Sequence, residues 1–275
     1  MAAFPARIHV LIARKALVGV VIRRGPSKQV ATYHWNLKTD NFKLGQWLKG
    51  RIYERRSDLS PDGRYMIYFA MNGKWNSESL GSWTAISRAP YLKAVECFPK
   101  GVCWHGGGLW TGKNTYWLND TKAPPSSSSG VRHDKQFQPV DGRGGECLSV
   151  YFPRLLRDGW TIARESRSGH VLTAVEQVVF EKQVSRLWML VKTAHAGIEH
   201  AEGRGCYWDT HQLVATDGRV IDLPGWEWAE VDRGSLIWAE SGRLFRAMLD
   251  GDGLTGITEL IDLRAAKFEA LAAPY

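Results

Sequence analysis

The sequence predicts an all-β fold, and three observations carry that prediction. Short runs of β-branched and aromatic residues recur along the 275 residues. Asp-Gly and other glycine-containing turns separate these runs, as they do in antiparallel hairpins. Thirteen tryptophans are present, which indicates either a sheet-rich core filled by indole rings or an aromatic binding surface, or both.

The first half contains six runs with the residue types of strands. They are Ile8–Ala13, Val18–Arg23, Val30–Leu37, Tyr65–Ala70, Trp83–Ser87 and Lys93–Phe98. The turn signals between them include Thr39-Asp40-Asn41 and Asp62-Gly63.

The second half shows the same pattern of short strand-like runs separated by turns. Its expected strands are Trp160–Arg164, Val171–Phe180, Arg186–Thr193, Gln212–Ala215, Val220–Leu223, Ser235–Ala239 and Arg243–Met248. Val175–Val184 could be helical by length, but its valines favour a strand. Arg264–Ala272 could also be helical and has better helix formers, but it is terminal and short.

One stretch carries a recognisable pattern, Asp58-Leu-Ser-Pro-Asp-Gly-Arg-Tyr-Met-Ile-Tyr-Phe-Ala70. Pro61 presets φ for the turn, Gly63 tolerates positive φ, and an apolar strand follows. The stretch resembles the blade signature of WD-repeat-like β-propellers, including the propeller of the Tol system. The resemblance implies a β-propeller, and roughly twenty short strands would make about five four-stranded blades. The alternative is two β-sandwich-like halves.

A Pro/Ser-rich segment divides the chain. Residues 120–138 include Pro124-Pro-Ser-Ser-Ser-Ser-Gly130, which cannot build a core. Because both halves show the same alternation of short strands and turns, we expect residues 1–275 to form a single propeller-like domain. In this domain the segment would be an exposed insert.

The charge distribution indicates the kind of binding partner, and the cysteine content indicates the cellular compartment. Residues 1–119 carry 18 Lys and Arg against 6 Asp and Glu, whereas residues 120–275 carry 18 against 22. This asymmetry predicts that the first half faces a protein or an anionic polymer, nucleic acid included. Four cysteines are too few for a disulfide scaffold, and neither a signal peptide nor a membrane-spanning run is evident. We therefore expect a cytoplasmic protein with reduced thiols and no membrane partner.

Basic and aromatic residues interleave in the first half and give the candidate binding residues. Such a mixture suits a phosphate backbone with stacked bases, but it equally suits arginines packed on tryptophan or paired with surface acids. A glycine run that lets the chain bend follows Trp104 and His105. The candidate ligand-binding residues are Arg23, Arg24, Lys28, Arg51, Arg55, Arg56, Trp104 and His105.

Other chemistries find less support. Cys97, Cys103 and His105 are the nearest approach to a metal cluster, but the short zinc-knuckle spacing is absent, so no metal and no cofactor are expected. No phosphate loop and no Gly-x-Ser-x-Gly elbow occur. A glycosidase needs two carboxyl groups, and none of the available pairs stands out among Asp58, Asp62, Glu96, Asp141 and Glu146.

The sequence therefore favours a non-catalytic binding or scaffold protein for a protein or polyanionic partner. The first alternative is a glycan-directed hydrolase or lyase on a propeller scaffold, because tryptophan-rich loops suit sugar faces. The second alternative is a nucleic-acid-binding protein. No catalytic residue is assigned.

Overall fold

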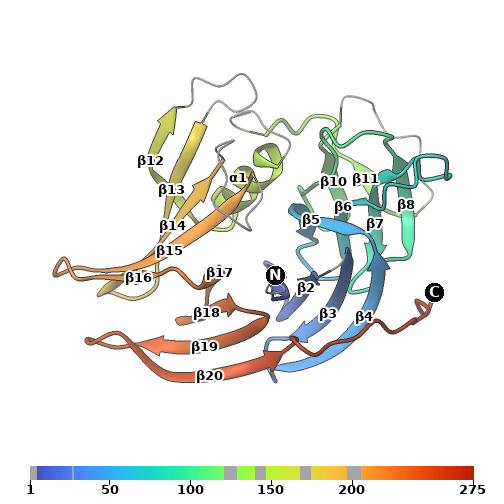
Figure 1. Ribbon diagram of the computed structural model, residues 1–275. Helices are drawn as coiled ribbons and strands as arrows, with labels where there is room; N and C mark the ends of the chain where they lie inside the picture. The colour runs from blue at the N-terminus through green and yellow to red at the C-terminus, as the bar shows by residue number, and fades with distance from the viewer. Residues whose placement is uncertain (1–4, 27, 121–128, 140–146, 168–174, 197–205) are drawn as a thin grey trace. The chain divides into compact units, whose positions relative to one another are not determined.

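A computed structural model describes residues 5–26, 28–120, 129–139, 147–167, 175–196 and 206–275. The described residues form five sheets and one helix (Figure 1). Each sheet keeps its strands in chain order. Four of the five are antiparallel meanders, whereas in the remaining sheet β11 pairs with β10 in parallel. The predicted all-β class is confirmed, and five sheets of three to five strands agree with the expected number and size of blades. Closure of these sheets into a propeller stays a prediction.

The chain divides into two compact units. One contains residues 9–142, 146–154 and 266–275, and the other contains residues 1–8, 143–145 and 155–265. We call them the basic unit and the acidic unit, after the charge of the two sequence halves. The expectation of a single domain stays a prediction.

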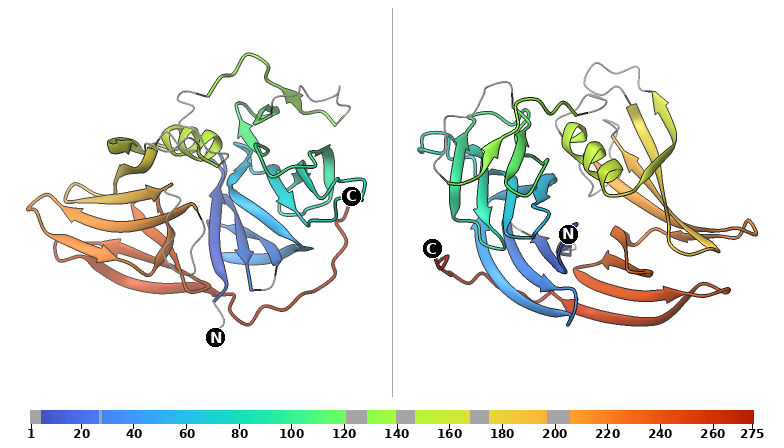
Figure 2. Two further views of the ribbon diagram at one scale, coloured as in Figure 1. Left: turned by 45° about the horizontal axis from the view of Figure 1, so that its top comes forward. Right: turned by 180° about the vertical axis from the view of Figure 1, so that it is seen from behind.

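Three sheets and a helix segment belong to the basic unit, and their strand order can be followed in Figures 1 and 2. The first sheet contains β1 (Arg7–Ile12), which begins in the other unit, β2 (Val18–Arg24), β3 (Gln29–Asn36) and β4 (Asn41–Lys49). The second contains β5 (Arg51–Leu59), β6 (Tyr65–Met71), β7 (Ser82–Arg88) and β8 (Ala94–Pro99). The third contains β9 (Gly108–Trp110), β10 (Thr115–Leu118) and β11 (Arg132–His133).

Two sheets form most of the acidic unit. One contains β12 (Thr161–Arg167), β13 (Val175–Gln183), β14 (Trp188–His195), β15 (Trp208–Ala215) and β16 (Val220–Leu223). The other contains β17 (Trp226–Asp232), β18 (Ser235–Glu240), β19 (Arg243–Leu249) and β20 (Leu254–Asp262). The helix α1 (Leu148–Arg157) precedes them and crosses the division between the units at Arg154.

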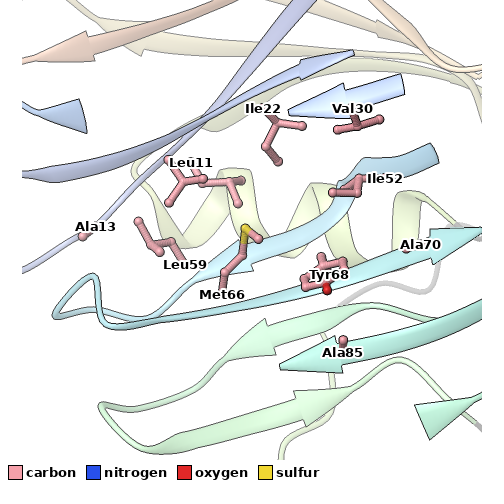
Figure 3. Packing of buried hydrophobic residues seen from close by; sticks show 11 residues of the cluster. Leu11, Ala13, Ile22, Val30, Ile52, Leu59, Met66, Tyr68, Ala70 and Ala85 are labelled. Atoms are coloured by element: carbon pink, nitrogen blue, oxygen red, sulfur yellow. The ribbon is translucent and has the colours of Figure 1, made fainter. Parts of the chain in front are cut away.

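The core of the basic unit packs its first sheet against its second. Leu11 and Ile22 of the first sheet meet Ile52, Met66 and Tyr68 of the second, as Figure 3 shows. Each of these side chains is at most 3% exposed, and burying a side chain of this size contributes about 1.5–3 kcal/mol. The Tyr68 hydroxyl donates to the carbonyl of Leu92 at 2.6 Å, so the ring is buried without an orphaned polar atom.

The turn predicted at Asp62-Gly63 is present. The Gly63 N–H donates to the Ser60 carbonyl at 2.9 Å, and Gly63 has φ +75°. The Asp62 carboxylate accepts from the Ser60 hydroxyl and from both the backbone and the guanidinium of Arg64. β6 then runs over Tyr65–Met71, one residue beyond its predicted end. The resemblance of this stretch to WD-repeat-like blades stays a prediction.

Two expected features differ from the structure. Residues 264–272 form no helix; they continue as an extended tail on which Phe268 packs against Trp47, with ring centroids 5.9 Å apart. The one helix of the described residues lies at Leu148–Arg157, a segment that the sequence did not indicate, and it contains Pro153. Side-chain packing of the tail outweighed its helix propensity.

The Pro/Ser-rich insert is described only in part. Residues 121–128 of the predicted insert lie outside the described residues. In the remainder, Val131 is 2% exposed and Arg132–His133 form β11, which pairs with β10 in parallel. Residues 131–133 of the insert are therefore tied to the third sheet, whereas Lys135, Gln136 and Gln138 are exposed as predicted.

Candidate functional site

The basic residues predicted to form one binding surface have separate places in the structure. Arg23 is 3% exposed; its guanidinium donates to the Gly25 carbonyl at 2.6 Å and lies 5.4 Å from the Trp47 ring centroid. Burial lowers the pKa of Arg23 from its ordinary value. Lys28 and Arg51 are exposed, near the bond from the Gly50 N–H to the Lys28 carbonyl.

Arg24 and Arg55 converge on one carboxylate. Glu54 is 4% exposed, and its Oε1 lies 3.2 Å from Arg24 Nη2 and 3.4 Å from Arg55 Nη1. Arg55 is 8% exposed and lies 5.3 Å from the ring centroid of Tyr151. Both arginines thus pair with Glu54 inside the protein. The side chain of Arg24 is still 38% exposed, whereas Arg55 is buried.

A bulge in β5 explains why so many charged residues are buried there. The β5–β6 pairing steps from Tyr53↔Phe69 to Asp58↔Ile67, so residues 54–57 leave the ladder. All four are at most 8% exposed, and Asp58, which follows, accepts a hydrogen bond from the Trp110 N–H at 2.7 Å. The bulge therefore turns consecutive polar side chains inward instead of alternating them between the two faces.

Arg56 connects this bulge to the loop that carries Trp104 and His105. Its Nη1 donates to the Cys103 carbonyl at 2.7 Å and also to the His105 carbonyl. Trp104 itself is 49% exposed and His105 is also exposed. Of the predicted residues, the structure thus brings Arg56, Trp104 and His105 together, with Trp104 facing solvent.

A second loop beside this one carries another exposed indole. Trp75, between β6 and β7, is 51% exposed and lies over Gly81, where an added Cβ would meet the ring at 2.5 Å. The two loops are joined at their bases, because the Lys100 N–H donates to the Ser82 carbonyl and the Ser82 hydroxyl donates to the Val102 carbonyl.

These loops form the candidate site, which we call the tryptophan surface. It comprises four large apolar side chains that are 44–51% exposed, namely Trp75, Leu80, Val102 and Trp104. Leu80 of the first loop lies against Gly101 of the second, because a Cβ added at Gly101 would lie 3.6 Å from the Cβ of Leu80. Contiguous exposed apolar side chains of this kind mark binding sites. The sequence indicated Trp104 through its glycine run, but nothing marked Trp75, because its contact with Gly81 belongs to the loop geometry.

The other tryptophans that the sequence left open are mostly core residues. Fully buried rings include Trp35, Trp110, Trp160 and Trp188. Trp226, Trp238 and Phe245 form a stacked series in the acidic unit, with successive centroids 4.5 and 5.3 Å apart. Both interpretations of the tryptophan content therefore apply, to different residues.

The carboxylates available for catalysis have unequal positions. Asp58 is 2% exposed and Asp62 is held in its turn. Glu96 is half-buried on β8, and together with burial, the larger cause, its charge raises the pKa of Tyr116 to about 12. Asp141 and Glu146 lie outside the described residues.

The structure bears on three further expectations, namely reduced thiols, the absence of a metal and the absence of a membrane-spanning helix. All four cysteines are free, and Cys97 and Cys103 are exposed. Within the described ranges, no group of three His, Cys, Asp or Glu side chains could hold a metal ion, and the absence of a metal and of a cofactor stays a prediction. No helix in the described part of the chain has the length and apolarity needed to cross a membrane.

Comparison with known proteins found distant matches among solved structures. No protein-family model and no curated protein matches the chain. The GH43 BlXynB protein from Bacillus licheniformis is similar over 94% of this chain and 56% of its own length, with 11% identity and a TM-score of 0.37. The chain thus spans little more than half of that protein. A similarity of this strength assigns no activity to the chain.

The expectation of a non-catalytic scaffold is corrected. The correction rests on this chain's own residues. The main ground for a polyanion surface is removed, because Arg23, Arg55 and Arg56 are buried in internal contacts. The charge asymmetry in the sequence therefore overstated the basic surface.

Proposed function

We propose that the chain is a glycan-directed hydrolase or lyase whose sugar chain binds at the tryptophan surface. The observation that carries the proposal is the pair of half-exposed indole rings, Trp75 and Trp104, on two loops joined at their bases. An indole ring presents a flat apolar face with a polar edge, which matches the C–H face of a pyranose ring and its hydroxyl rim.

The residues beside the rings support a sugar more than a purely apolar ligand. Asn76 and Glu78 are exposed in the same loop as Trp75. The hydroxyls of Ser77 and Ser79 lie 3.0 Å apart, and the Ser77 hydroxyl donates to the Lys74 carbonyl. Amide, carboxylate and hydroxyl groups next to an apolar face are the partners that sugar hydroxyls require.

The catalytic carboxyl groups are to be assigned by mutation. Hydrolysis of a glycosidic bond uses one carboxyl group as an acid and a second as a base or nucleophile. The set to replace by the corresponding amide, one residue at a time, consists of Asp58, Asp62, Glu96, Asp141 and Glu146. We expect two of these variants to lose activity while the tryptophan surface still binds sugar.

The test is product release from a panel of neutral and acidic polysaccharides. Reducing-end assays report hydrolysis, and ultraviolet absorbance of an unsaturated product reports elimination. We expect Trp104→Ala and Trp75→Ala each to lower kcat/KM at least tenfold, or about 1.4 kcal/mol. Leu17→Ala, which also removes an exposed apolar side chain (44% exposed) from the basic unit, is the matched control. Release of no product from any polysaccharide would refute the proposal.

A further inference from the structure

We infer that Arg56 is a positioning residue, which holds Trp104 in its sugar-binding arrangement; the inference rests on the proposed function. The two carbonyls that accept hydrogen bonds from Arg56 Nη1 belong to Cys103 and His105, the residues on either side of Trp104. A single buried nitrogen therefore fixes the peptide groups that flank the exposed ring.

The guanidinium is itself held from several sides. Arg56 is 3% exposed, and its Nε donates to Cys147 Sγ at 3.3 Å. Its Cζ lies 4.9 Å from the ring centroid of Tyr53 and 4.8 Å from that of Phe69. Cation–π contacts of this kind are worth about 0.5–2 kcal/mol each. Because the donor cannot swing away, the carbonyls that it binds are fixed with it.

The loop is also closed immediately after His105. His105 has φ +58°, and the Gly107 N–H donates to the Thr84 hydroxyl at 2.8 Å. A Cβ at Gly106 would lie 2.3 Å from the Phe69 ring. The backbone around Trp104 is thus ordered before any ligand arrives, so binding does not have to order it.

The chemistry requires arginine. A guanidinium can donate from one nitrogen to two carbonyls while its plane lies on aromatic rings and its Nε reaches a sulfur. A lysine ammonium is a compact charge on a flexible stem and keeps only part of this geometry. Arg56→Lys is therefore the conservative variant, and Arg56→Met removes all the hydrogen bonds while keeping an apolar stem.

The experiment compares steady-state kinetics on a soluble oligosaccharide derived from the polysaccharide that is cleaved. We expect Arg56→Met to raise KM at least tenfold while kcat stays within about threefold, with Arg56→Lys intermediate. In a Trp104→Ala background, Arg56→Met should change KM less than twofold, because its effect acts through the ring. Arg51→Met, an exposed arginine on the same strand, is the control.

A second measurement separates this inference from the proposed function. Hydrogen exchange of residues 101–107 should quicken at least tenfold in both Arg56 variants, whether or not sugar is cleaved. Unchanged exchange in the folded Arg56→Lys protein would overturn the inference even if the chain hydrolyses glycans. An equal KM effect with and without Trp104 would also overturn it. Quickened exchange in both Arg56 variants, together with a wild-type protein that cleaves no glycan, would retain the positioning role of Arg56 and refute the proposed function.

Discussion

At the scale of single residues, charge in this sequence was a poor guide to exposure. Arg23, Arg55 and Arg56 look like surface residues in the sequence, yet each is at most 8% exposed. Burying a charge is costly unless it is paired or hydrogen-bonded. Here each guanidinium has a carbonyl or carboxylate partner and an aromatic ring beside it. Gly25 and Glu54 are sequence neighbours of Arg23 and Arg55, but the aromatic rings and the Cys103 carbonyl come from distant positions, which a single sequence does not connect.

Asp62 gives a prediction about pH. Burial raises its pKa, but hydrogen bonds from Ser60 and Arg64 outweigh burial and leave the pKa below the ordinary 3.8. A carboxyl group whose pKa is depressed by folding stabilises the fold above its unfolded pKa, and this stabilisation is lost as pH falls through the folded pKa. We expect Asp62→Ala to cost about 1 kcal/mol near neutral pH, by urea unfolding, and to cost progressively less below about pH 4.

The control for this prediction is Asp252→Ala, at an exposed turn position between β19 and β20. Its unfolding free energy should follow that of the wild type over the same pH range. If the cost of Asp62→Ala were the same at pH 3 and pH 7, the carboxylate hydrogen bonds would not be what stabilises this turn.

At the scale of elements, the bulge in β5 and the loop after β8 approach so closely that only glycine fits at position 107. Gly107 has φ +76°, and a Cβ there would lie 1.9 Å from the Arg56 carbonyl oxygen. Gly73 has nearly the same φ, +72°, but open space around it. Comparing alanine substitutions at Gly73 and Gly107 therefore separates the free-energy cost of a strained φ from that of a steric clash.

We expect Gly73→Ala to destabilise the fold by about 1 kcal/mol, because a positive φ alone is strained for alanine. Gly107→Ala should cost about 3 kcal/mol or more, because the bulge or the loop must also move. Thermal and urea unfolding of both variants provide the measurement. Equal losses would show that the loop does not press against the bulge.

The elements differ in how far the sequence predicted them. β6 and β18 were found because aromatic and β-branched runs follow Gly-containing turns, and the predicted β class is confirmed. β4 and β5 were missed because their charged and polar residues hide the strand pattern, and the bulge at residues 54–57 removes the alternation altogether. Half of the site was also missed, since the loop of Trp75 is joined to the loop of Trp104 only through hydrogen bonds at their bases.

At the scale of the whole chain, residues 266–275 rejoin the basic unit after the last strand of the acidic unit. Gln46 on β4 is the central contact. Its Nε2 donates to the Leu271 carbonyl at 2.8 Å, and its Oε1 accepts from the N–H groups of Leu92 and Lys93. The Tyr275 hydroxyl accepts from the Arg88 N–H and donates to the Lys93 carbonyl. One amide side chain thus joins the tail to the β7–β8 connection.

Replacing Gln46 should therefore loosen the tail. We expect Gln46→Ala to lower the unfolding free energy by about 1–3 kcal/mol, because two backbone donors lose their acceptor. Limited proteolysis should cut residues 266–275 earlier than in the wild type. Lys43→Ala, an exposed residue on the same strand, is the control. Equal cleavage of the two variants would contradict the role of Gln46.

The most direct test of the central claim uses protein labelled with fluorotryptophan. The chain should give thirteen fluorine resonances, of which those of Trp75 and Trp104 are identified by Trp→Phe variants. Titration with an oligosaccharide released from the cleaved polysaccharide should shift these two resonances most, since their rings are about half exposed on adjoining loops. Larger shifts at buried rings such as Trp35 or Trp188, or no shift at all, would contradict sugar binding at the tryptophan surface.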